Sequence, residues 1–195
     1  MFERIREIWR RSNTAGEPYP AELAFMLRNP LRRLILSPTE LLRRLDLAPT
    51  DRVLELGPGP GYFSLAVARA LPSGHLVLVD LQPAMLEKVR RRLTRAGITQ
   101  ASYHAANAHA LPLIDGSIDV AFLVAVIGEV PDPNQALLEL YRVLRPGGRL
   151  HVTEQPGDAD FLPRDRITEL AKSAGFEPGR HWGRGNNYSA EFLRP

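Results

Sequence analysis

Residues Val53-Leu54-Glu55-Leu56-Gly57-Pro58-Gly59-Pro60-Gly61 join a short apolar run to a glycine-rich turn. The residues that follow, Tyr62–Leu71, carry apolar side chains at helical spacing. A turn between a strand and a helix points backbone N–H groups and the positive end of the helix at one place. Because glycine has no side chain, a ligand can approach this backbone closely. The stretch therefore predicts a strand, a ligand-binding turn and a helix.

An acidic residue, Asp80, follows the next apolar run, His75–Val79, and comes 23 positions after Gly57. In nucleotide-binding βαβ units, a carboxylate at this place accepts hydrogen bonds from the ribose hydroxyls. The alternative is a cap for the helix predicted over Pro83–Arg95, although Asp80 comes early for that role. We expect Asp80 to face the same ligand as the glycine turn.

The spacing of the glycines argues against a dinucleotide. Nicotinamide enzymes usually carry G-x-G-x-x-G, whereas here the third glycine comes one residue early and Tyr62 stands where it should be. Glu55, inside the strand, would also be an unfavourable neighbour for a pyrophosphate. A carboxylate there suits a ligand that carries a positive amine. A nicotinamide oxidoreductase is therefore disfavoured.

Strand-like and helix-like segments alternate from residue 51 onward, which predicts a three-layer α/β fold. The uniformly apolar run Ile118–Val126 fits a parallel sheet covered on both faces. The predicted strands are Val53–Leu56, His75–Val79, Ala101–His104, Ile118–Val126 and Arg149–Thr153, then an antiparallel pair, Phe176–Trp182 and Tyr188–Leu193. The predicted helices are Tyr62–Leu71, Pro83–Arg95, Pro133–Leu144 and Arg164–Ala174.

The composition fits one globular domain: 195 residues, 44% hydrophobic and 24% charged, without cysteine. The lack of cysteine excludes disulfides and cysteine metal sites. The longest apolar stretch is too short for a membrane span, and the N-terminus lacks the apolar core of a signal peptide. We therefore expect a cytoplasmic protein.

Residues 1–45 differ from the rest because they are rich in arginine and broken by prolines. We divide the chain into an N-terminal helical cap, residues 1–45, and a ligand-binding domain, residues 46–195. The cap could close a substrate pocket against water, or it could be a structural strap. Its arginines, and those of Lys88–Arg95, could face solvent or contact anionic lipid or nucleic acid.

In the order of its motifs the chain resembles the class I S-adenosylmethionine-dependent methyltransferases, and in particular the group that includes the ubiquinone and menaquinone C-methyltransferases. The matching stretches are Val53–Gly61, Leu78–Asp80, Asn107-Ala108 with Leu111-Pro112, Asp115–Asp119, Val130–Pro133 and Leu144–Gly148. The resemblance implies a Rossmann-like, seven-stranded, mostly parallel sheet whose last strand is antiparallel. It also implies S-adenosylmethionine as cofactor and S-adenosylhomocysteine as product.

The resemblance assigns cofactor roles to individual residues. The methionine end would be held by Glu55, Gly57 and Gly59, the ribose by Asp80, and the adenine by Asn107 and Ala108, with Leu81 beside its ring. The family usually has Asp where Asn107 stands. An amide still accepts a hydrogen bond from the exocyclic amine of adenine, but without charge assistance.

Two residues are candidates for catalysis, Glu129 and His109. Many relatives carry histidines after the fourth strand, where this chain has Gly128-Glu129. Glu129 could orient or deprotonate a nucleophile or attract a cationic one, and the alternative is a surface carboxylate. His109 follows the adenine segment and could face the pocket. The spacing of the five histidines does not suggest metal ligands, so we predict no metal site.

We therefore expect methyl transfer to a small-molecule acceptor by in-line displacement. A lipid or quinone-like acceptor is one form of this reading, because Ile5, Ile8 and Trp9 share a predicted helix with arginines and could touch a membrane surface. An RNA methyltransferase is an alternative, disfavoured because no Asn/Asp-Pro-Pro-aromatic motif follows the fourth strand. A non-catalytic cofactor-binding subunit is another. The sequence does not predict the oligomeric state.

Overall fold

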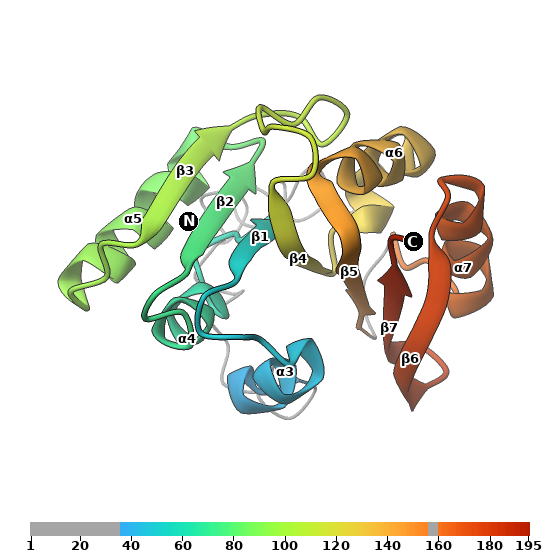
Figure 1. Cartoon of the computed structure of the whole chain (residues 1–195), viewed down its shortest axis with the longest axis horizontal. Helices are drawn as coiled ribbons and strands as arrows, with labels where there is room; N and C mark the ends of the chain where they lie inside the picture. The colour runs from blue at the N-terminus through green and yellow to red at the C-terminus, as the bar shows by residue number, and fades with distance from the viewer. Residues whose placement is uncertain (1–35, 156–159) are drawn as a thin grey trace, which may run out of the picture.

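The computed structural model describes residues 36–155 and 160–195. Seven strands form one sheet in the order β3-β2-β1-β4-β5-β7-β6, with helices on both faces (Figure 1). The strands are β1 Arg52–Leu56, β2 His75–Asp80, β3 Ala101–Ala105, β4 Ile118–Val124, β5 Leu144–Glu154, β6 Glu177–Arg184 and β7 Asn187–Leu193. The helices are α3 Pro38–Leu45, α4 Ser64–Arg69, α5 Pro83–Arg95, η3 Ile127–Glu129, α6 Pro133–Val143 and α7 Arg164–Ser173.

The sheet has the predicted topology. Strands β1 to β5 pair in parallel, and β7 pairs antiparallel with both β5 and β6. The expected Rossmann-like sheet with an antiparallel last strand is therefore confirmed. The carboxyl ends of β1, β2 and β4 meet at one edge, where open α/β sheets bind their ligands.

Each central strand alternates between two separate cores. Val53 and Val120 pack on one face with α3, α4 and α5, whereas Leu54 and Ala121 pack on the other face with α6 and α7. Apolar side chains on both faces are what a buried parallel strand requires. This explains why the strands appear in the sequence as continuous apolar runs.

Several predicted boundaries are wrong. The largest difference is in β5, which begins at Leu144 and not at Arg149. Two other differences have a local cause. The strand expected over Ile118–Val126 ends at Val124, because Ala125 takes a positive φ of 54° and turns the chain out of the sheet. The helix expected over Tyr62–Leu71 begins at Ser64, because a turn occupies the preceding residues. In both places a local apolar pattern continues past the point where the backbone leaves the regular element.

The end of the predicted N-terminal cap is helix α3, which Ser37 caps by accepting a hydrogen bond from the Glu40 N–H. Leu41 and Leu45 bury this helix in the same core as α4. It lies toward the amino ends of the strands, at the bottom of Figure 1. Residues 1–35 lie outside the described residues, so a cap over the opposite edge stays a prediction.

No helix in the described parts of the chain is long and apolar enough to cross a bilayer.

The packing of the glycine turn on α5 can be tested with a double-mutant cycle. Gly61→Ala should destabilise the protein by about 2–4 kcal/mol, because Gly61 has a φ of 77° and an added Cβ would lie 2.5 Å from Val89 Cγ2. In a Val89→Ala background the same substitution should cost at least about 1 kcal/mol less. Urea unfolding measures both values. Equal costs in the two backgrounds would show that the contact does not restrict the turn.

Candidate functional site

A cavity of about 210 Å³ opens at the carboxyl ends of β1, β2 and β4. It collects eight of the nine predicted site residues, which come from four separate segments. These are Glu55, Gly57, Gly59, Asp80, Leu81, Asn107, Ala108 and Glu129. Prediction from the sequence therefore found residues that the fold brings together, and the geometry around each of them shows what it could bind.

The glycine turn leaves β1 with backbone N–H groups at the cavity. Gly57 has a φ of 67°, and a Cβ there would lie 2.6 Å from Val126 Cγ2. Its N–H donates to the Val79 carbonyl at 2.8 Å and so ties the turn to β2. The next glycine, Gly59, donates its N–H to Asp80 Oδ2 at 3.2 Å. The turn and the acidic residue therefore form one unit.

Glu55 is the most unusual group in the cavity. Its side chain is buried, and its Oε2 atom has no hydrogen-bond partner. Burial, opposed by a hydrogen bond with Ser64, raises the pKa of Glu55 to about 8; the Asp80 charge adds to the rise and Arg92 opposes it. A buried carboxyl oxygen without a partner destabilises the protein unless a ligand satisfies it. The group fits a ligand that presents a positive amine.

Asp80 holds its carboxylate at the end of β2. Oδ1 accepts a hydrogen bond from the Gln82 N–H at 2.9 Å, in addition to the bond from Gly59 to Oδ2. Burial raises the pKa of Asp80, and these two backbone donors oppose the shift. Gln82 is the residue that caps α5, without a side-chain capping bond. Asp80 thus steadies the turn and keeps acceptor capacity toward the cavity.

The segment expected to meet adenine lies in a loop, residues 106–117, between β3 and β4. Asn107 is exposed, and its Oδ1 accepts a hydrogen bond from the His109 N–H at 3.0 Å. Leu81, on the neighbouring segment, is a large apolar side chain that is 55% exposed. An exposed leucine beside a loop suits contact with the flat face of a base.

A pair of side chains on α6 holds this loop, and sequence reasoning missed it. Glu139 Oε2 accepts a hydrogen bond from the Leu111 N–H at 2.7 Å. Arg142 donates to the carbonyls of Leu111 at 2.9 Å and of Leu113 at 2.8 Å. The two side chains also pair with each other at 2.8 Å, and this pairing lowers the pKa of Glu139. Their spacing on α6 gave no signal because their targets lie about 30 residues away in the sequence.

Of the two predicted catalytic residues, the structure places one in the lining of the cavity and the other outside it. Glu129 lines the cavity at the end of η3. His109 does not line it, although its N–H and carbonyl take part in bonds within the loop and with Gln135. We therefore do not propose His109 as a catalytic residue.

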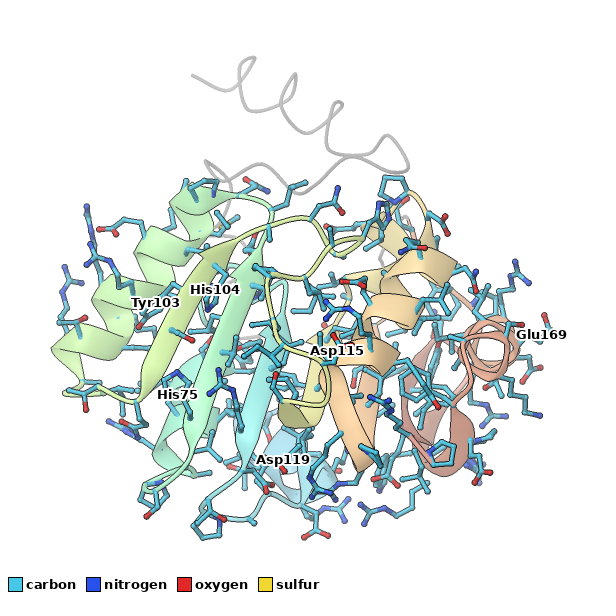
Figure 2. The ribbon with its side chains drawn as sticks, turned by 45° about the horizontal axis from the view of Figure 1, so that its top comes forward. His75, Tyr103, His104, Asp115, Asp119 and Glu169 are labelled. Atoms are coloured by element: carbon cyan, nitrogen blue, oxygen red, sulfur yellow. The ribbon has the colours of Figure 1, made fainter. Side chains whose placement is uncertain are left out.

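The other histidines also lie outside the cavity lining. Figure 2 shows His75 and His104 beside the edge strand β3, where His75 Nε2 lies 3.1 Å from Ser102 Oγ. Within residues 36–155 and 160–195 there is no group of three or more His, Asp or Glu side chains arranged to hold a metal ion.

Three features of the structure are typical of the α/β methyltransferase folds that bind a nucleoside: the order of the strands, the glycine turn and the carboxylate at the end of β2. Comparison with known proteins identifies the family. The family described as "Methyltransferase domain" matches residues 54–152. The ubiquinone/menaquinone biosynthesis C-methyltransferase of Pasteurella multocida is 38% identical over 105 residues, which are 53% of this chain and 39% of that protein. The arsenite methyltransferase of Halobacterium salinarum is 31% identical over 112 residues, 57% of this chain and 29% of that protein.

Among solved structures, a methyltransferase from Aquifex aeolicus that depends on S-adenosylmethionine superposes with a TM-score of 0.84. It covers 91% of this chain and all of its own, at 19% identity, which shows a shared fold. The chain belongs to the class I S-adenosylmethionine-dependent methyltransferase family, whose cofactor is S-adenosylmethionine. It spans less than half the length of the curated relatives named above.

Cofactor binding should release a proton from Glu55. At pH 7 a carboxyl with a pKa of about 8 is mostly protonated, whereas an ammonium group beside it favours the carboxylate. Calorimetry with S-adenosylhomocysteine at pH 7, in buffers of different ionisation enthalpy, should show release of close to one proton. Glu55→Gln should bind more weakly and release none. Equal release by both proteins would contradict this role.

The unliganded protein provides the control for folding. Because the folded-state pKa of Glu55 lies above its usual 4.5, the unliganded protein should lose stability as pH rises from about 4.5 to about 8. Glu55→Gln should lack this loss and be at least as stable as the wild type at pH 8, as thermal unfolding would show. Weak ligand binding by this variant would then not reflect misfolding.

The loop contacts of Arg142 should matter for cofactor affinity. Arg142→Lys keeps the charge but loses the planar fork that reaches two carbonyls, so we expect about tenfold weaker binding of S-adenosylhomocysteine. Arg145→Lys is the matched control, because the Arg145 side chain bonds with Asp119, in β4, and with the Pro146 carbonyl instead of the Leu111 and Leu113 carbonyls. Calorimetry on both variants measures the difference. Equal affinities would mean that the loop keeps its shape without Arg142.

Proposed function

We propose that the protein transfers a methyl group from S-adenosylmethionine to a small-molecule acceptor by in-line displacement. The observation that carries this proposal is the pair of carboxyl groups at the ends of β1 and β2, which face one cavity beside the glycine turn. One of them, Glu55, has a buried oxygen without a partner.

The residues of the cavity fit the parts of the cofactor. Glu55, with Gly57 and Gly59 beside it, would hold the amino-acid end, and Asp80 would accept from the ribose hydroxyls. The adenine would lie between Leu81 and the loop that carries Asn107 and Ala108. When bound, the cofactor supplies a methyl group that is already activated on a sulfonium.

The protein's own contribution is alignment, exclusion of water and control of a proton. Positioning an acceptor in line with the reacting bond can contribute about 7–11 kcal/mol. The apolar walls of the cavity, among them Val126, Val130 and Pro131, keep water away from that position. Glu129 is the cavity residue outside the cofactor set that can accept a proton, and a positioned base adds about 10²–10⁴-fold.

Several observations support a small-molecule acceptor. The site is a cavity between strand ends, which is the usual form of a small-molecule site. The named relatives are enzymes of quinone biosynthesis and of arsenite methylation. A quinone-like or lipid acceptor reached at a membrane surface is compatible with this proposal, with residues 1–45 as the cap and residues 46–195 as the methyltransferase domain.

The first test is ligand binding. Thermal unfolding should shift upward with S-adenosylmethionine and S-adenosylhomocysteine and should not shift with NAD. Asp80→Ala should weaken S-adenosylhomocysteine binding at least about tenfold, since two charge-assisted hydrogen bonds to the ribose are lost. Asp165→Ala, whose side chain is 94% exposed on α7, is the control and should bind normally. No thermal shift at millimolar cofactor would refute the proposed function.

A further inference from the structure

The cavity is acidic on three sides. Glu55, Asp80 and Glu129 line it from the ends of β1, β2 and η3. Among the residues that the structure describes, no lysine, arginine or histidine lines it. Those of the three carboxyl groups that are ionised raise the local concentration of cations in this partly enclosed cavity and repel anions. The cavity therefore selects its ligands by charge as well as by shape.

The first two carboxyl groups are accounted for by the cofactor in the proposed function. Glu129 is not, because it follows β4, whereas the proposed cofactor contacts come from the ends of β1 and β2 and from the loop after β3. It shares its part of the wall with Val126, Val130 and Pro131, which are apolar. A single carboxylate in an apolar wall is suited to recognise one charged group on an otherwise apolar molecule.

The segment that carries Glu129 is built to hold one position. Ala125 has a φ of 54°, which is strained for a residue other than glycine, and its N–H donates to the Thr153 carbonyl at 2.8 Å. Strain of this kind persists where the surrounding structure imposes it, often at functional sites. Gly128 packs so closely on the Asp160 carbonyl that no Cβ would fit there. The backbone of η3 is thus fixed from both sides.

A second polar group faces the same space. The hydroxyl of Tyr62 is buried and has no hydrogen-bond partner, and the residue lines the cavity next to Phe63. A buried hydroxyl without a partner is unfavourable until a ligand satisfies it. A polar atom on the acceptor could do so, while the aromatic ring of Phe63 contacts its apolar part.

From these contacts we infer that the acceptor is an amine on an apolar body, and that Glu129 selects it over carboxylate and phosphate acceptors. This inference rests on the proposed function and names its substrate class. The amine arrives as an ammonium ion and pairs with Glu129. It loses one proton, to Glu129 or to water, before it can react.

The neutral nitrogen then forms a bond to the methyl carbon with its lone pair. The carbon–sulfur bond breaks, its electron pair stays on sulfur, and the positive charge passes to the methylated nitrogen. Neither an oxidant nor a metal is needed for this balance. The carboxylate of Glu129 stabilises the ammonium ion before the transfer, and it stabilises the methylated cation afterwards once the proton has passed to water; it would disfavour an anionic acceptor.

Three probes of nearly equal shape test the inference: 2-phenylethylamine, 2-phenylethanol and 3-phenylpropionate. Their affinities for the full-length protein saturated with S-adenosylhomocysteine are measured by calorimetry at pH 7. We expect the amine to bind at least about tenfold more tightly than the carboxylate, a difference of about 1.4 kcal/mol. The alcohol should bind with an affinity between the two. Glu129→Gln should reduce this preference to about threefold or less.

The control is Glu169→Gln, which changes the net charge equally but lies on α7, at the right of Figure 2. It should keep the full preference for the amine. The inference is overturned if the carboxylate binds as tightly as the amine, if Glu129→Gln keeps the preference, or if no probe binds at 10 mM. Failure of S-adenosylhomocysteine itself to bind would refute the proposed function as well, so the two failures are distinct.

Discussion

The buried carboxyl of Glu55 is the constraint on which the rest of the site depends. The strand that carries it is covered on both faces, so the side chain is almost fully buried where it lines the cavity. Its charged form therefore requires a positive partner from a ligand. The turn that follows consists largely of glycine and proline, so few side chains stand between its backbone and the same ligand. Glu55 thus takes part both in the packing of the sheet and in the chemistry of ligand binding.

The cofactor end of the site could be predicted from the sequence because its determinants are local. Glu55 and Gly57 are two residues apart, and Asp80 ends the next strand of a regular βαβ unit. A parallel sheet brings the carboxyl ends of adjacent strands together whatever else the chain does. Continuous apolar runs were equally sufficient to predict the central strands β1, β2 and β4. For such residues, the spacing along the chain predicts their position in the structure.

The remaining parts depend on contacts between distant residues, which spacing does not reveal. β4 ends where Ala125 takes a positive φ and bonds with Thr153, 28 positions later, and η3 packs through Gly128 against Asp160. The loop expected to meet adenine is held by Arg142 on α6, beyond the next strand. His109 was predicted to face the pocket because it follows the adenine segment, yet it is not among the residues that line the cavity.

The two ends of the cavity are therefore determined by different features of the structure. The cofactor end is formed by strand termini and a glycine turn, which the fold itself requires, so relatives with very different acceptors can share it. In the proposed function the acceptor end is formed by the segment after β4, where Glu129 sets the charge of the wall from outside the sheet. A neutral or basic wall can serve phenols and acids, whereas a carboxylate held by a fixed backbone favours a cation. Acceptor specificity in this fold can thus change at a few positions while the cofactor site stays the same.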